Sequence, residues 1–319
     1  MPNALWFALF LLLVAGQPGR APAAQGSSSH PDVRKQFNLE RHYDIKGPHY
    51  YHSSSRYDGF NGATGELVYR FTVSGDFRRR VVDPRKDGCV VEEFLWKNAK
   101  ITYVSPQDGK VINVKPLPFA EGFTYQLCFE DDYGDISELV DHSKLPKTID
   151  GLLFYEQIID AHSPFDWMLT RKHGLIHRLS TAGTELELPE RKESSAVDFR
   201  PFGYWEFHSR GPRTSKFIGL TVVKGETGAI LELSPTDVPV PFESTMGAGE
   251  QTVVQKFITD WWGQVAISLD DHLPLWGSMY ERATPLGKDQ RPGPPLACIH
   301  RRLALARITA AEFEGEKPK

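Results

Sequence analysis

Residues 217–233 decide the fold, and they read Phe217-Ile218-Gly219-Leu220-Thr221-Val222-Val223-Lys224-Gly225-Glu226-Thr227-Gly228-Ala229-Ile230-Leu231-Glu232-Leu233. Two runs of aliphatic and β-branched residues flank a centre rich in glycine and charge. Such runs favour strands, and the centre has turn chemistry. The stretch therefore predicts an antiparallel hairpin.

Strand patterns of the same kind occur on both sides of this hairpin. Leu67, Tyr69, Phe71 and Val73 alternate with polar residues, which predicts a half-buried strand. Later residues predict a second hairpin, 262–269 with 275–284, and a last strand at 298–308. In the first half, four turn sequences separate the predicted strands: Ser74-Gly75-Asp76, Lys86-Asp87-Gly88, Gln107-Asp108-Gly109 and Asp132-Tyr133-Gly134.

One helical region interrupts the strands near residues 150–173. Residues 152–159 have helix-compatible spacing. Ser163 and Pro164 have the signature of a new helix start, as N-cap and first helical residue, and Gly174 supplies a stop. We therefore expect two short helices that pack across the sheet.

The predicted class is mainly β (α+β), with one large antiparallel sheet of successive hairpins that is curved or forms a half-barrel. Residues 24–65 are polar and irregular and indicate a leader and a long surface loop. Residues 66–311 form one β-rich domain, or two similar halves, 66–148 and 184–311, joined by the helices. Residues 312–319 form a polar tail.

The N-terminus predicts export. Residues 4–15 are almost wholly apolar but shorter than the roughly 20 residues of a membrane span. Ala21-Pro22-Ala23 matches the small-x-small pattern of signal cleavage, so residues 1–23 are expected to be a signal peptide. We expect a periplasmic or extracellular protein without a transmembrane anchor. The net charge of −4 gives no electrostatic footprint for nucleic acid.

Three cysteines, Cys89, Cys128 and Cys298, leave several arrangements open. Export permits one disulfide, and Cys89 with Cys128 is favoured because both lie in predicted strands. The alternative is three buried thiols.

The hairpins, the helical insert and the apolar N-terminus resemble the curved-sheet proteins of the bacterial envelope related to the lipoprotein-localisation carrier. Residues 67–73, 217–233 and 262–284 carry this resemblance, which is one of architecture. It implies an incomplete β-barrel whose concave face holds acyl chains. No lipid-attachment cysteine follows the predicted cleavage site.

Aromatic side chains on the predicted strands are candidates for binding an apolar ligand, because a sheet curled around such a ligand needs large apolar residues on one face. The alternative is a purely structural role, in which these side chains fill a core beneath the helices. A late group, Trp261, Trp262, Trp276 and Tyr280, forms either an exposed platform or a wall of the core. The ligand-binding candidates are Tyr69, Phe71, Trp96, Tyr125 and Trp205.

Two weaker patterns suggest chemistry. His173 and His177 have metal-ligand spacing, although Gly174 interrupts the helix that would align them. Asp160 could orient His162 as a general base, against a role as an ordinary acid at a helix end. We expect no cofactor, since no phosphate-binding glycine loop, G-x-S-x-G or C-x-x-C is present.

Three functions are compatible with these patterns. The first is a non-enzymatic exported envelope protein that binds an apolar ligand or a lipidated partner on a concave sheet. The second is a secreted hydrolase or metal-dependent enzyme that uses His162 and Asp160, or His173 and His177. The third is a surface adhesion or structural module.

Overall fold

A computed structural model describes residues 34–39, 47–84, 90–129, 142–166, 180–188, 194–198, 203–208, 213–234, 240–246, 253–286 and 298–315. All of them belong to one compact unit, Val33–Lys319. Within these residues the chain is mainly β, with fourteen strands in a single antiparallel sheet. The predicted fold class is confirmed.

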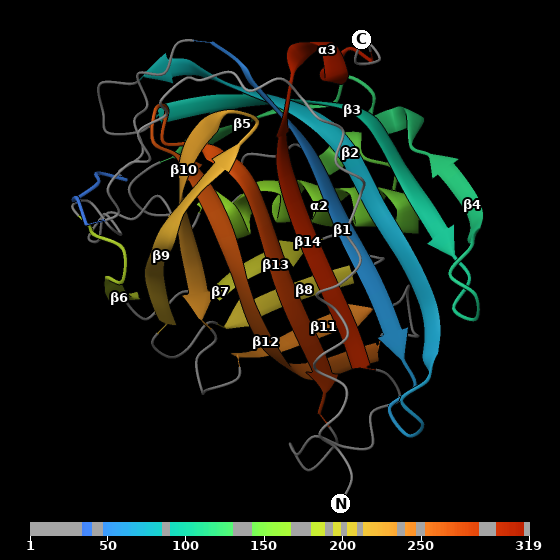
Figure 1. The fold of residues 1–319 in the computed structure, drawn as a ribbon. Helices are drawn as coiled ribbons and strands as arrows, with labels where there is room; N and C mark the ends of the chain where they lie inside the picture. The colour runs from blue at the N-terminus through green and yellow to red at the C-terminus, as the bar shows by residue number, and fades with distance from the viewer. Residues whose placement is uncertain are drawn as a thin grey trace, which may run out of the picture. The chain divides into compact units, whose positions relative to one another are not determined.

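Six long neighbouring strands form the centre of the sheet (Figure 1). The C-terminal strand lies between the first strand and the penultimate one, so the two ends of the unit meet in the middle of the sheet. In spatial order the six are β3 (Val90–Val104), β2 (Leu67–Pro84), β1 (His49–Phe60), β14 (Cys298–Ile308), β13 (Pro274–Pro285) and β12 (Val253–Ser268).

Each outer strand of this centre pairs with two different strands along its length. One half of β3 pairs with β5 (Thr124–Phe129) and the other half with β4 (Val111–Pro116). On the side away from β13, β12 likewise pairs with two strands, β10 (Glu226–Ser234) and β11 (Val240–Met246), and each begins a separate branch of the sheet. The branch of β10 continues with β9 (Arg213–Val223) and β6 (Glu185–Leu188), and the branch of β11 continues with β8 (Gly203–His208) and β7 (Ser194–Asp198).

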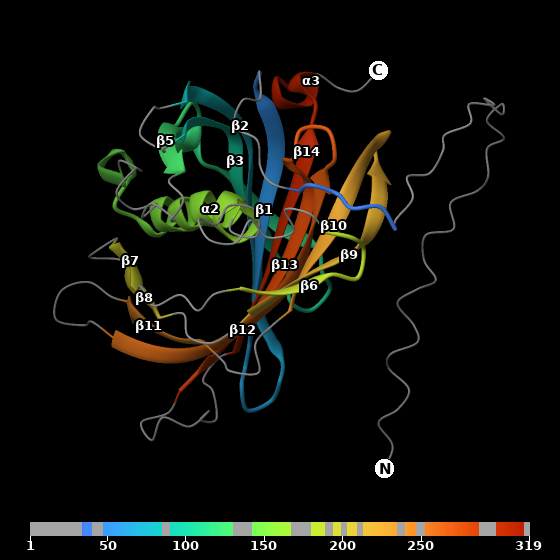
Figure 2. The ribbon, with the colours of Figure 1, turned by 90° about the vertical axis from the view of Figure 1, so that its left-hand side faces the viewer.

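Helix α2 (Ile149–Asp166) lies against one face of this sheet, which we call the inner face. Figure 2 shows β12 bending, so that the branch of β11, β8 and β7 extends beneath α2. The sheet is open: its longest path of paired strands runs from β4 to β6.

The hairpin at residues 217–233 is confirmed as β9 and β10. Lys224 and Gly225 form its turn, both with positive φ. The second hairpin is confirmed as β12 and β13. The Gln107-Asp108-Gly109 turn is also present, with Gly109 at φ 71.

The predicted turn at Ser74-Gly75-Asp76 is wrong, because β2 continues through these residues, with a shift in its pairing to β3 between Ser74 and Asp76. Gly75 lies close against the core instead of in a turn: a Cβ there would lie 3.1 Å from Cε3 of Trp96, a tight contact. Asp76 accepts a hydrogen bond from Asn98 Nδ2 at 2.8 Å and pairs with His52 on the neighbouring strand.

The predicted loop is wrong for residues 49–60, which form the central strand β1. Its inner face carries Tyr51, Ser53, Ser55 and Tyr57, all buried. Serines at buried positions remove the apolar alternation by which a half-buried strand is usually identified.

The predicted break at Ser163 and Pro164 is wrong, since α2 continues to Asp166. Phe165 is 1% exposed, and its ring lies so close to Gly277 that an added Cβ would approach Cε1 to 2.3 Å. Packing of Phe165 over this glycine therefore accounts for the last helical turn staying on the sheet, against the usual cost of an interior proline.

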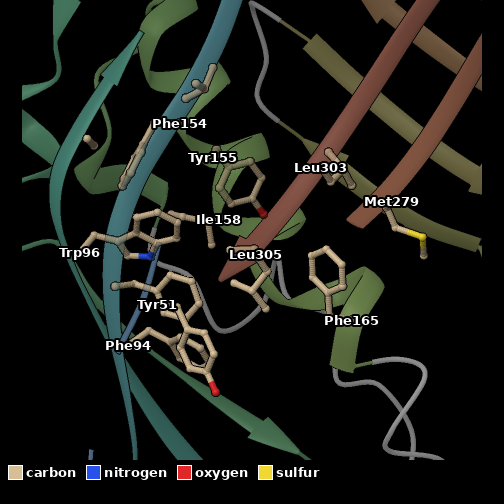
Figure 3. Packing of buried hydrophobic residues seen from close by; sticks show 14 of the residues in the cluster. Tyr51, Phe94, Trp96, Phe154, Tyr155, Ile158, Phe165, Met279, Leu303 and Leu305 are labelled. Atoms are coloured by element: carbon tan, nitrogen blue, oxygen red, sulfur yellow. The ribbon is translucent and has the colours of Figure 1, made fainter. Parts of the chain in front are cut away.

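The hydrophobic core fills the space between α2 and the inner face. Trp96 and Phe94 of β3 are fully buried, and the Trp96 ring meets Phe154 of α2 edge-on at 5.4 Å. Figure 3 shows Phe154, Ile158 and Phe165 of α2 among side chains from β3, β13 and β14.

The first two residues of the predicted polar tail, Glu312 and Phe313, belong to a short docked helix, α3 (Ala310–Phe313). Thr309 and Glu312 form a capping box at its start. Phe313 is 1% exposed and packs against Tyr50 and beneath the Lys97 ammonium group. These first residues of the tail therefore belong to the folded unit.

Candidate functional site

Three polar side chains of α2 meet three polar side chains of β1 on the inner face. Gln157 Nε2 donates to Ser53 Oγ at 2.7 Å, and Ser55 Oγ donates to Asp160 Oδ2 at 2.8 Å. The Tyr57 hydroxyl donates to Glu156 Oε2 at 2.9 Å. We call these six residues, with Arg301, the polar seat of α2.

Arg301 of β14 holds this seat together. Its guanidinium group binds the Asp160 carboxylate and also Glu281 of β13, the latter at 2.8 Å. It lies 5.1 Å from the centre of the Tyr57 ring as well. Burial opposes the charge of Arg301, but the carboxylates of Asp160 and Glu281 raise its pKa well above the ordinary value.

Glu156 is also within the electrostatic influence of Arg301, but its hydrogen bond is to the uncharged Tyr57 hydroxyl. Burial raises the pKa of its carboxyl to about 7; Arg301 opposes this rise, while the negative charge of Asp160 adds to it. The hydroxyl of Tyr57 donates to the carboxylate and lowers the pKa somewhat. Glu156 therefore titrates near neutral pH.

Beside Glu156, aromatic rings continue the core outward along the inner face. The rings of Tyr57 and Phe71 of β2 are stacked, with their centroids 4.7 Å apart. The Phe71 centroid lies 5.9 Å from that of Tyr69 and 6.1 Å from that of Tyr103 of β3. Tyr57 is 7% exposed, whereas Tyr69 is 38% exposed. We call Tyr57, Tyr69, Phe71 and Tyr103 the aromatic patch.

Gly59 makes room for the most exposed ring of this patch. An added Cβ on Gly59 would lie 2.1 Å from Cε1 of Tyr69, so the tyrosine ring lies directly across β1 at this point. Burial raises the pKa of Tyr69, and the negative charge of Glu156 contributes to the same shift. The patch and Glu156 are therefore electrostatically coupled.

The structure divides the predicted ligand-binding residues into two groups. Tyr69 and Phe71 are neighbours in the aromatic patch. Trp96 and Tyr125 lie in the core, where Trp96 Nε1 donates to the Tyr125 hydroxyl at 3.3 Å and both are buried. Trp205 lies on β8, but its side chain is outside the described residues.

The sequence prediction missed Tyr57, Tyr103 and Glu156. Tyr57 falls within the predicted loop, and no sequence pattern distinguishes Tyr103 from the other aromatic residues. Glu156 carries no local signal, because its contact to Tyr57 joins residues far apart in the chain. The helical spacing of residues 152–159 was the one feature that could have placed Glu156 on a sheet-facing position.

Asp160 is not an acid at a helix end. It lies within α2, is 6% exposed, and is bound by Arg301 and Ser55. A carboxylate held in this way is poorly placed to orient a neighbouring histidine. The side chain of His162 lies outside the described residues, as do His173 and His177.

The cysteine prediction stays open. Cys298 is a free, half-buried thiol, while Cys89 and the side chain of Cys128 lie outside the described residues. In the part of the chain that is described, no group of three or more His, Cys, Asp or Glu could hold a metal ion. No described helix is long and apolar enough to cross a bilayer.

The late aromatic group is partly exposed on the outer face. Trp262 is 43% and Tyr280 is 36% exposed, and their rings stack at 5.6 Å. The Arg302 guanidinium covers Tyr280 at 5.3 Å. This outer group therefore consists of two stacked, partly exposed rings with a guanidinium group over one of them.

Comparisons with known proteins give little further information. No protein-family model and no curated protein matches the chain. Among solved structures, a DUF1329 family protein from Desulfovibrio piger is similar, with 9% identity over 84% of this chain and 90% of that chain, at a TM-score of 0.15. This weak similarity carries no argument, and the resemblance to lipoprotein-localisation carriers is not confirmed by it.

Proposed function

We propose that the chain is an exported, non-enzymatic envelope protein that binds an apolar ligand or a lipidated partner at the aromatic patch. The apolar run at residues 4–15 and the small residues that follow it support export. The ligand-binding part of the proposal is supported by the inner face itself.

One observation carries this function: the row of rings that leads from the buried Tyr57 through Phe71 to the exposed Tyr69. Contact with this row removes apolar and aromatic surface from water at about 25 cal/mol per Å². The apolar part of the bound ligand would lie beside α2 and in contact with the rings of the aromatic patch.

The test is titration with N-phenyl-1-naphthylamine, a neutral apolar probe whose fluorescence rises on leaving water. We expect the wild type to bind it and Tyr69→Ala to weaken binding by about tenfold, the equivalent of ~1.4 kcal/mol. Phe71→Ala, at the centre of the patch, should weaken it at least as much.

Tyr280→Ala is the matched control, because Tyr280 is equally exposed but lies on the outer face. Circular dichroism establishes that each variant is folded. Absence of probe binding to the wild type, or an equal loss in Tyr280→Ala, would reject the aromatic patch as the site.

A further inference from the structure

The region around Glu156 has more negative than positive groups. Arg301 is shared by Asp160 and Glu281, whereas the hydrogen-bond partner of Glu156 among the described residues is the uncharged Tyr57 hydroxyl. When Glu156 is ionised, three carboxylates face one guanidinium group.

The charged and titratable groups around Glu156 come from several elements. Asp160 comes from α2, Tyr57 from β1, Glu281 from β13 and Arg301 from β14. Tyr69 of β2 is influenced by Glu156 in turn. A nearby cation, Lys115 of β4, interacts with Tyr103 but is already paired with Asp150 at 2.5 Å. The patch therefore has no uncompensated positive charge among these groups.

The aromatic rings are suited to the same kind of charge. A cation over the face of a tyrosine ring is attracted by the ring quadrupole, most strongly where water is partly excluded. Arg301 already occupies such a position over Tyr57. The half-exposed Tyr69, together with the Glu156 carboxylate, offers a second position that is open to solvent on one side.

We propose that the ligand of the aromatic patch is an amphiphile with a cationic ammonium head, which binds beside Glu156 and Tyr69 while its apolar chain lies along Phe71 and Tyr103. This inference rests on the proposed function and specifies the chemical class of its ligand. An anionic head would instead face Glu156, Asp160 and Glu281.

The test compares decyltrimethylammonium with decanoate, two amphiphiles with ten-carbon chains and opposite charge, by isothermal titration calorimetry below their micellar concentrations. At pH 8 we expect the wild type to bind the ammonium compound about tenfold more tightly, the size of one partly desolvated ion contact. The Glu156→Gln variant should lose this preference, because it binds the ammonium compound more weakly and, with one like charge removed, binds decanoate no more weakly than the wild type.

The pH dependence has a defined sign. Because the pKa of Glu156 is about 7, the carboxylate is mostly protonated at pH 5 and mostly ionised at pH 8. Affinity for the ammonium compound should therefore rise between these values in the wild type and stay flat in Glu156→Gln. Glu66→Gln, which changes an exposed acid in the turn between β1 and β2, is the control and should behave as the wild type.

The outcomes separate the two proposals. Equal affinity for both amphiphiles, or a preference that survives in Glu156→Gln, overturns the cationic head while the apolar site stands. If neither amphiphile nor the neutral naphthylamine probe binds, the proposed function itself fails.

Discussion

The inner faces of β3 and β1 lie under the same helix but are buried by different means. On β3, the rings of Phe94 and Trp96 both contact the ring of Phe77, and the Trp96 ring also contacts Phe154 of α2. On β1, Ser53 and Ser55 are equally buried, and each hydrogen-bonds to a side chain of α2. The inner face of β3 is therefore held to α2 by ring packing, whereas the serines of β1 are held to it by directional hydrogen bonds, which fix the position of the helix along the strand.

The largest decrease in the free energy of unfolding is expected for a substitution among the buried rings of β3. Replacing Trp96 by alanine removes a fully buried ring and leaves a cavity, which should lower the free energy of unfolding by about 3–5 kcal/mol. Equilibrium unfolding in urea measures this. Trp262→Ala on the outer face is the control and should cost under about 1 kcal/mol; equal losses would show that the core between β3 and α2 does not dominate stability.

A smaller decrease in the free energy of unfolding is expected when Arg301, the cation of the polar seat, is removed. Arg301→Met leaves Asp160 and Glu281 without their guanidinium partner, which should cost about 2–3 kcal/mol. We expect less than for a fully buried pair, because the Arg301 side chain is 18% exposed. The adjacent Arg302→Met is matched in size and faces outward, so a similar loss there would remove any special role for Arg301.

The smallest effect concerns a single hydrogen bond. Ser55→Ala deletes the hydroxyl that donates to Asp160, and the expected cost is about 1 kcal/mol. Ser54→Ala makes the same change on the opposite face of β1 and should stay within about 0.5 kcal/mol of the wild type. Thermal unfolding of both variants compares them directly, and indistinguishable melting temperatures would mean that the bond contributes nothing net.

The contrast between the two strands also explains how far the sequence could be interpreted. The hairpin of β9 and β10 is predictable because its apolar pattern and its Lys224-Gly225 turn agree. β1 escapes prediction because its buried serines are stabilised by partners on α2. The composition of such a strand is that of a loop, and only its contacts with the helix show that it is buried.

The candidate site was predictable to the same extent. Alternation along β2 identifies Tyr69 and Phe71 as facing one side, and the structure places them together. That same pattern cannot show that Trp96 lies deep in the core while Tyr69 is partly exposed, because depth depends on where α2 crosses the sheet. Glu156 could not be assigned, since its pairing with Tyr57 depends on the tertiary position of the helix.

The place of β14 has a consequence for how the chain reaches this structure. Tyr50 pairs with Ile308, and the same C-terminal strand pairs on its other side with β13. The centre of the sheet therefore stays incomplete until the chain from β1 through to β14 is available. Pairings between such distant segments close late and slowly, because the entropy of a long loop is lost before the contacts form. Until then β1 and β13 each present an unpaired edge, and β14 is the strand that completes the centre of the sheet.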